Sequence, residues 1–78
     1  MEHTGRMDRE TTNTKAMLTR RELEILRLLA AGQTSKQIAA ALGLSPETVM
    51  WHRKQMHLKF GVHSSLEMVL SALEQKIL

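Results

Sequence analysis

From Leu18 onward, hydrophobic residues recur every three or four positions, which is the spacing of one face of an α-helix. Four segments show this period, and short polar or glycine-containing turns separate them. The pattern predicts helices over residues 20–31, 35–42, 46–60 and 65–77. No segment alternates between apolar and polar residues as a half-buried strand requires, so we expect no strands. The prediction is an all-α domain with a four-helix bundle-like fold.

Each predicted helix begins after a residue that is typical of a helix N-cap, whose side-chain oxygen accepts a hydrogen bond from an otherwise unpaired backbone N–H. Three of the starts have the spacing of a capping box, in which a Glu or Gln three residues later bonds back to the N-cap backbone. These pairs are Thr19 with Glu22, Thr34 with Gln37 and Ser64 with Glu67. At the other start Ser45 is the N-cap, and Pro46 takes the first helical position, where no N–H is needed. Gly32, Gly43 and Gly61 follow the first three helices and are placed to end them.

The last predicted helix is apolar on more than one side. Its main stripe, which we expect to face the core, consists of Leu66, Val69, Leu70, Leu73 and Ile77. Met68 and Ala72 lie beside this stripe and would widen it into a surface for a second copy of the chain. We therefore predict that Met68 and Ala72 are dimer contacts. The alternative is that they are incidental exposed apolar area.

The chain has 78 residues, which is enough for one small domain. Residues 1–17 are polar and have no apolar period, so we expect a flexible N-terminal tail before a folded domain over residues 18–78. The absence of cysteine excludes disulfides and thiolate metal sites. No apolar run approaches the roughly 20 residues that span a bilayer, and the N-terminus does not resemble a signal peptide. We expect a cytoplasmic protein without a membrane partner.

Catalysis and metal binding have no support in the sequence. No paired carboxylates, glycine-rich phosphate loop or activated nucleophile occurs, so we expect no enzyme activity and no cofactor. His52, His57 and His63 are spaced by five and six residues, which does not bring them to one helical face, so we expect no metal site. His52 is instead expected to form a structural hydrogen bond near the turn that precedes its helix.

The second and third predicted helices are joined only by residues 43–45. A short glycine-containing turn between two helices is typical of a helix-turn-helix, whose second helix enters the major groove of DNA. On this second helix, Met50, Trp51 and Lys54 lie outside the apolar inner face. The net charge of the chain is +3, and the excess falls within residues 18–78, which is compatible with binding nucleic acid.

Over residues 18–62, many residues share their order and spacing with a known family. They are Leu18, Thr19, Arg21, Glu22, Glu24, Gly32, Thr34, Lys36, Ile38, Ala39, Leu42, Ser45, Thr48, Val49, His52, Lys59, Gly61 and Val62. With these residues the segment 18–62 resembles the LuxR/GerE-type helix-turn-helix of bacterial transcription regulators. The resemblance implies a four-helix domain whose third helix reads bases and whose fourth helix often contacts a second copy.

The resemblance also implies roles for individual side chains. By position, Met50, Trp51 and Lys54 would face the bases, where Lys54 is able to donate to O6 and N7 of guanine. The implied phosphate contacts are Thr34, Ser35, Lys36, Thr48 and Lys59. Three positions depart from the family pattern. Met50 stands where lysine is usual, Trp51 where a smaller residue is usual, and Ser65 where arginine is common.

We therefore predict sequence-specific binding of double-stranded DNA through a recognition helix at about residues 46–60, which regulates bacterial transcription as a homodimer. Two alternatives arise from the same segment. Because Met and Trp are favoured in protein interfaces, the domain would in one alternative have lost or weakened DNA binding and act on a partner transcription regulator. The other alternative is the fourth region of a sigma factor, whose recognition helix is normally richer in arginine than residues 51–55.

Overall fold

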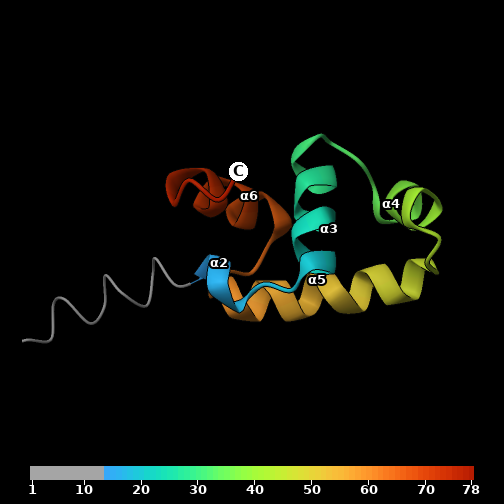
Figure 1. Cartoon of the computed structure of the whole chain (residues 1–78), viewed down its shortest axis with the longest axis horizontal. Coiled ribbons are helices and arrows are strands. Elements are labelled where there is room, and N and C mark those ends of the chain that lie inside the picture. The colour runs from blue at the N-terminus through green and yellow to red at the C-terminus, as the bar shows by residue number, and fades with distance from the viewer. Residues whose placement is uncertain (1–13) are drawn as a thin grey trace, which may run out of the picture.

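The computed structural model describes residues 14–78, in which the regular structure is entirely helical (Figure 1). The helices are α2 (Thr14–Met17), α3 (Arg20–Ala30), α4 (Ser35–Leu42), α5 (Pro46–Phe60) and α6 (Ser65–Glu74). No strand occurs between residues 14 and 78, so the prediction of an all-α fold is confirmed. Helix α5 packs against each of the other four helices and forms the centre of the domain.

The capping residues explain why the observed bounds of α4 and α5 agree with the pattern of the sequence. Thr19 and Thr34 each accept a bond from the backbone N–H three residues later, and the side chain at that later position bonds back, so both capping boxes are complete. Ser45 caps α5 in the same way but without the return bond. Gly43 and Gly61 end α4 and α5 in the left-handed conformation. The predicted bounds of α4 and α5 are therefore confirmed.

The start of α6 has only half of the predicted capping box. The Ser64 hydroxyl accepts a bond from the N–H of Glu67 at 3.1 Å, as expected. The Glu67 carboxylate, however, accepts from the N–H of His63 at 2.9 Å instead of from Ser64. The carboxylate thus fixes the residue before the N-cap and orients the connection from α5 to α6.

Helix α6 ends earlier than the predicted residue 77 because the chain reverses after Glu74. Lys76 adopts a left-handed φ of 62°, and the N–H of Ile77 bonds to the carbonyl of Ala72 at 2.8 Å. This reversal returns Ile77 to the core, where its exposed fraction is 7%. Ile77 is buried as predicted, but it reaches the core from a turn and not from the helix.

Residues 14–17, which we expected in the tail, form the short helix α2. Thr14 is only 5% exposed, and α2 lies beside α5 (Figure 1). Four residues are too few to show a helical period, so the sequence pattern did not indicate this helix. The folded part of the chain therefore includes residues 14–17. The rest of the predicted tail, residues 1–13, lies outside the described residues.

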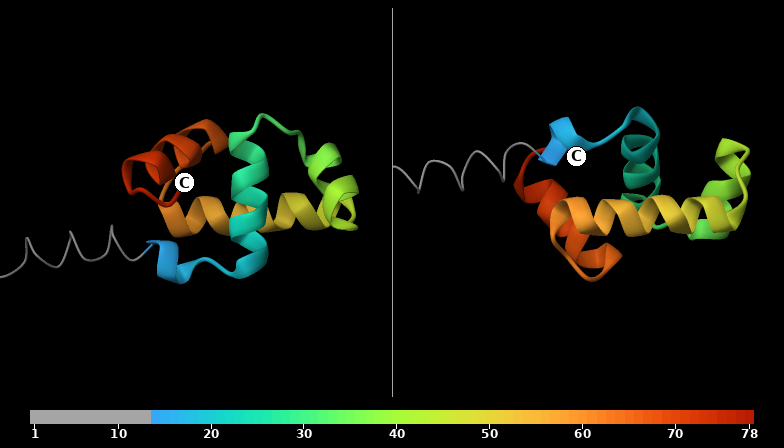
Figure 2. Two further views of the ribbon diagram at one scale, coloured as in Figure 1. Left: turned by 45° about the horizontal axis from the view of Figure 1, so that its top comes forward. Right: turned by 90° about the horizontal axis from the view of Figure 1, so that it is seen from below.

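The core lies where α3 crosses α5, with α4 on one side of α3 and α6 on the other (Figures 1 and 2). It consists of Ile25, Leu26, Ile38, Ala39, Val49, Met56, Met68, Ala72 and Ile77. Because α5 supplies Val49 and Met56 to this core, only one side of the helix is held against the domain. The opposite side of α5 is left open to solvent over its central turns.

The inner face of α6 differs from the prediction. Met68 and Ala72 are fully buried within a single chain, so the prediction that they are dimer contacts is wrong. Leu66, Leu70 and Leu73, which we expected in the core, are 69%, 55% and 53% exposed. Because α6 is apolar on several sides, its hydrophobic period does not determine which side faces inward. Ala72 is fully buried, so a leucine at that position would overfill the core.

Candidate nucleic-acid interface

The turn between α4 and α5 fixes the relative orientation of the two helices. Gly43 has a φ of 71°, a conformation that carries little cost only for glycine. Leu44 donates its N–H to the carbonyl of Ala39 at 2.9 Å and packs its side chain against the core. Ser45 then caps α5. The two helices therefore form the helix-turn-helix that the sequence predicted, with its turn anchored to the core.

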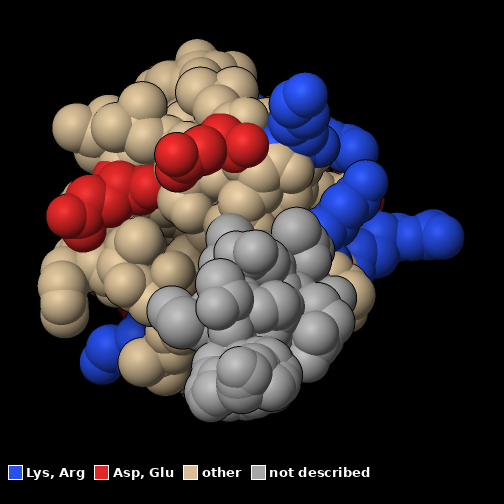
Figure 3. All heavy atoms as spheres, turned by 90° about the vertical axis from the view of Figure 1, so that its left-hand side faces the viewer, with Lys and Arg blue, Asp and Glu red and all other residues tan. Residues whose placement is uncertain are grey.

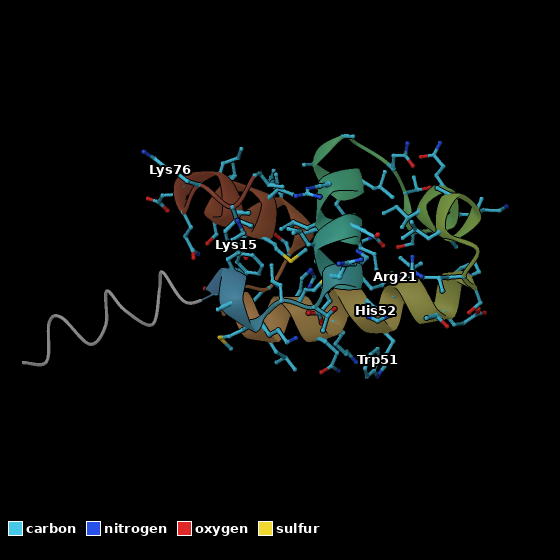
Figure 4. All side chains as sticks on the ribbon, viewed as in Figure 1. Lys15, Arg21, Trp51, His52 and Lys76 are labelled. Carbon is cyan, nitrogen blue, oxygen red and sulfur yellow. The ribbon has the colours of Figure 1, made fainter. Side chains whose placement is uncertain are left out.

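One side of α5 carries an exposed ridge, which we define as Met50, Trp51, Lys54 and Leu58. Met50, Trp51 and Leu58 are 61%, 58% and 72% exposed, and Lys54 is also exposed. Trp51 points away from the other helices (Figure 4). The three residues that we predicted to face bases thus lie together on one surface. Leu58 was missed, although its spacing of four from Lys54 and seven from Trp51 places it on the same side of a helix.

His52 supports this ridge from beside it. Its ring meets the Trp51 ring edge to face, with the centroids 5.2 Å apart and the planes at 74°. Its Nδ1 is buried and has no hydrogen-bond partner within residues 14–78, so the predicted bond near the turn is not formed there. His52 therefore acts by packing. Among the described residues, no three His, Asp or Glu side chains are grouped in a way that would hold a metal ion.

Three of the predicted phosphate contacts lie near the ridge at helix starts. Thr34 accepts from the N–H of Gln37 at 3.1 Å, which leaves its hydroxyl proton available to a partner. Lys36 is exposed and forms no ion pair with any residue of the described segment 14–78. Thr48 lies in the first turn of α5, with its hydroxyl 2.9 Å from that of Ser45. Hydroxyls and unpaired N–H groups at helix starts are suited to bind anions.

Lys59 differs from the other predicted phosphate contacts. Its Nζ donates to Oε1 of Glu22 at 2.7 Å, and the Glu22 side chain is only 4% exposed. The same oxygen accepts the backbone N–H of Thr19 at 2.9 Å, within the capping box of α3. Lys59 thus joins the end of α5 to the start of α3, and its charge is neutralised by a buried carboxylate. The structure gives Lys59 a structural role, so we no longer propose it as a phosphate contact.

Arg53, which lies next to Lys54 of the ridge, was also not predicted as a site residue from the sequence. Its guanidinium donates to Oγ of Ser35, at the start of α4, and to Oγ of Ser65, at the start of α6. These partners are 18 and 12 positions away, so no local pattern indicates them. One departure from the family pattern points to this contact, because Ser65 stands where arginine is common. In this chain, Arg53 brings a guanidinium to that serine from the neighbouring helix.

An open pocket of about 320 Å³ lies beside Arg53, and it is lined by Met50, Arg53, Lys54 and His57. The His57 Nε2 is 3.2 Å from Oγ of Ser65. Burial lowers the pKa of His57 below its ordinary value of 6.5, and the positive charge of Arg53 and the nearby His63 lower it further, whereas Glu67 raises it. His57 is therefore mainly neutral at pH 7 and is able to accept a bond from the Ser65 hydroxyl.

Charged side chains are distributed unevenly over the surface. On the face shown in Figure 3, Asp and Glu gather in one area and most of the Lys and Arg side chains in another. Within residues 14–78, ion pairs form only between Arg21 and Glu24 and between Glu22 and Lys59. Most of the basic side chains in this part of the chain are therefore available to an anionic partner.

Comparison with known proteins places these features in a family. Residues 16–72, which span α3 to α5 and most of α6, match the bacterial regulatory proteins of the luxR family. This chain belongs to that family. The LuxR-type helix-turn-helix implies DNA-binding transcription regulation.

Individual relatives are longer regulators. The LuxR-family chain is 47% identical over 60 residues to the uncharacterized response regulatory protein YgeK of Escherichia coli strain K12, and the match covers 77% of this chain and 41% of YgeK. It is 43% identical over 68 residues to the oxygen regulatory protein NreC of Staphylococcus aureus strain JH9, with 87% of this chain and 31% of NreC covered. The chain thus spans less than half the length of these relatives. No helix between residues 14 and 78 is long and apolar enough to cross a membrane.

Proposed function

We propose that this LuxR-type domain binds double-stranded DNA in a sequence-specific way, with α5 in the major groove, and thereby regulates bacterial transcription. The observation that carries the proposal is the two-sided character of α5. Val49 and Met56 are fully buried on one side, whereas Met50 and Trp51 are more than half exposed on the other. A helix that is held by the core along one side and free along the other fits the wide major groove of B-form DNA.

The ridge of α5 has suitable chemistry for base edges. Lys54 has no ion-pair partner within residues 14–78, so its ammonium is available to O6 and N7 of guanine. Met50 and Trp51 offer apolar surface to the C5-methyl group of thymine. The start of α4 would meet the DNA backbone through Thr34, Ser35 and Lys36. Thr48, in the first turn of α5, would add a further backbone contact. These contacts position the helix and carry no sequence information themselves.

We further propose that the domain binds DNA as a homodimer through the exposed face of α6. Leu66, Leu70 and Leu73 follow one another at spacings of four and three positions and are each more than half exposed, so they form one apolar strip on the helix. This strip replaces Met68 and Ala72 as the proposed dimer contact. A dimer would read two half-sites about 10 base pairs apart, as helix-turn-helix geometry requires.

Selection of duplexes from a random pool, followed by binding measurements on the enriched sequence, tests this function. We expect a preferred sequence with two related half-sites and an affinity that falls steeply with salt, because phosphate contacts release counterions. Lys54→Ala should remove most of the preference, whereas Arg27→Ala should retain it because Arg27 lies in the half of α3 that points away from α5 (Figure 1). Failure of the wild-type chain to bind any duplex between about 50 and about 200 mM salt would reject the proposal.

The ridge also supports a second candidate function, binding to a partner regulator. Leu58 is 72% exposed and, with Met50 and Trp51, makes three large apolar side chains on one helix side. Such a pattern is typical of a helix that docks into an apolar groove of another protein. The two functions are separated by Leu58→Lys, which should impair binding to a protein partner but leave DNA affinity equal or stronger because it adds a positive charge.

A further inference from the structure

The guanidinium of Arg53 has an unusual environment for a half-buried charge. Its two hydrogen bonds within the described chain go to neutral hydroxyls, Ser35 Oγ and Ser65 Oγ, and no carboxylate of residues 14–78 forms an ion pair with it. A charge that is removed from water is normally paired with an opposite charge. The charge of Arg53 is therefore held in place by two bonds without being neutralised.

The cluster around Arg53 still has hydrogen-bond donors to offer. A guanidinium carries five N–H groups, and these two bonds use only part of them. A serine hydroxyl that accepts a bond from Arg53 keeps its own proton, so Ser35 is able to donate to a further group. The pocket of about 320 Å³ beside Arg53 is also bordered by Lys54, and it has room for a tetrahedral anion. All of these features favour a ligand with negative oxygens.

The position of Arg53 agrees with the path of a nucleic-acid backbone. In the right-hand view of Figure 2, the first turn of α4 and the connection into α6 lie on one side of α5, and α2 and α3 lie on the other. Arg53 spans the helix starts on the first of these sides, through Ser35 and Ser65. A DNA strand whose phosphates pass the start of α4 would therefore meet the Arg53 guanidinium next.

We propose that Arg53 binds a DNA phosphate and that Ser35 and Ser65 hold its guanidinium ready for this contact. The proposal deepens the function proposed above and rests on it. Arginine is suited to this task because its planar fork matches two phosphate oxygens, whereas lysine acts as a point charge. Arg53 thus supplies the backbone contact that Lys59 does not make.

The salt dependence of DNA binding tests the role of Arg53 directly. For B-form DNA, each phosphate contact contributes about 0.9 to the slope of the logarithm of affinity against the logarithm of salt concentration. We expect Arg53→Gln to reduce this slope by about 0.9 for each bound domain, and Arg53→Lys to keep most of the slope at lower affinity. The matched control Arg27→Gln removes an exposed arginine of α3 and should leave the slope unchanged.

A purely structural role for Arg53 predicts a different result. If Arg53 only ties α4 and α6 to α5, Arg53→Gln would lower thermal stability but leave the salt slope of the folded protein unchanged, and this outcome would overturn the proposal. Should Arg53→Gln fail to fold, the wild-type chain provides the second measurement, the NMR signal of the Arg53 Nε–H on addition of a duplex. We expect a clear shift. Binding without a shift would reject the Arg53 contact alone, whereas absence of any binding by the wild type would reject the proposed function.

Discussion

The ammonium of Lys59 lies 2.7 Å from Oε1 of Glu22 and joins the end of α5 to the start of α3. The Glu22 side chain is 4% exposed and that of Lys59 is 26% exposed, so the pair is largely shielded from water. Lys36 and Lys54, in contrast, are exposed and have no ion-pair partner within residues 14–78. Of these three lysines, Lys59 therefore maintains the fold, and the other two are available to a partner.

Replacement of Lys59 should affect stability and not DNA binding. In Lys59→Met, the carboxylate of Glu22 keeps the bond from Thr19 but loses its counter-charge. We expect the free energy of unfolding, measured with urea, to fall by about 1–3 kcal/mol. The salt slope of DNA binding should stay at the wild-type value.

Lys36→Met is the matched control for this prediction. Because Lys36 is exposed and unpaired within the described segment, its loss should change the free energy of unfolding by less than about 0.5 kcal/mol. The same substitution should reduce the salt slope by about 0.9 for each domain. A Lys59→Met variant of normal stability with a reduced slope would show that Lys59 contacts a phosphate.

Lys54 and Lys36 should differ in their effect on sequence preference. Lys54 lies on the α5 ridge, so Lys54→Ala should weaken binding to the preferred sequence by about 1–3 kcal/mol more than binding to an unrelated duplex. Lys36→Ala should weaken both by similar amounts because the contact proposed for Lys36 is with the DNA backbone. Competition between the two duplexes measures the difference. Equal losses for both duplexes in Lys54→Ala would remove its base-reading role.

The features that the sequence predicts well are those that depend on neighbouring residues. The bounds of α4 and α5 follow from Thr34, Ser45 and the glycines after each helix, since a cap acts within a few residues of its own position. The exposed positions of Met50 and Trp51 follow from the helical period of a helix with one inner face.

The features that the sequence does not predict depend on residues far apart in the chain. Glu22 and Lys59 are 37 positions apart, and nothing local distinguishes Lys59 from a solvated lysine. The same holds for Arg53, whose partners come from two other helices. For α6, apolar residues on several sides allow more than one inward orientation, and packing against α3 and α5 selects the side with Met68 and Ala72.

The exposed strip of α6 should control assembly. Leu70 is 55% exposed, so Leu70→Glu should leave the fold intact while placing a charge in the proposed dimer contact. We expect a monomer in sedimentation experiments with the preferred duplex, and loss of the affinity advantage of two half-sites over one. Met68→Ala, at a fully buried position, should instead lower the free energy of unfolding by about 2–5 kcal/mol. Cooperative binding by Leu70→Glu would exclude this surface as the dimer contact.

His57 should make stability depend on pH. Its pKa in the folded chain is lowered from 6.5, mainly by burial and then by the charge of Arg53. Well above pH 6.5 the imidazole is neutral in both folded and unfolded chains, and its contribution to stability is fully present. As the pH falls below 6.5, the unfolded chain takes up the proton first, so stability decreases until the folded-state pKa is passed. His57→Gln should show a smaller decrease in melting temperature over this range, and an equal decrease would assign the effect to other groups.

The accessibility of Trp51 gives the most direct test that α5 enters the groove. Trp51 is the only tryptophan of the chain and is 58% exposed in the free domain, so quenching of its fluorescence by acrylamide reports on this one position. With the selected duplex at saturation, we predict that Trp51 becomes strongly protected from acrylamide. Saturated binding, confirmed by anisotropy of a labelled duplex, together with unchanged quenching would show that another surface meets the DNA.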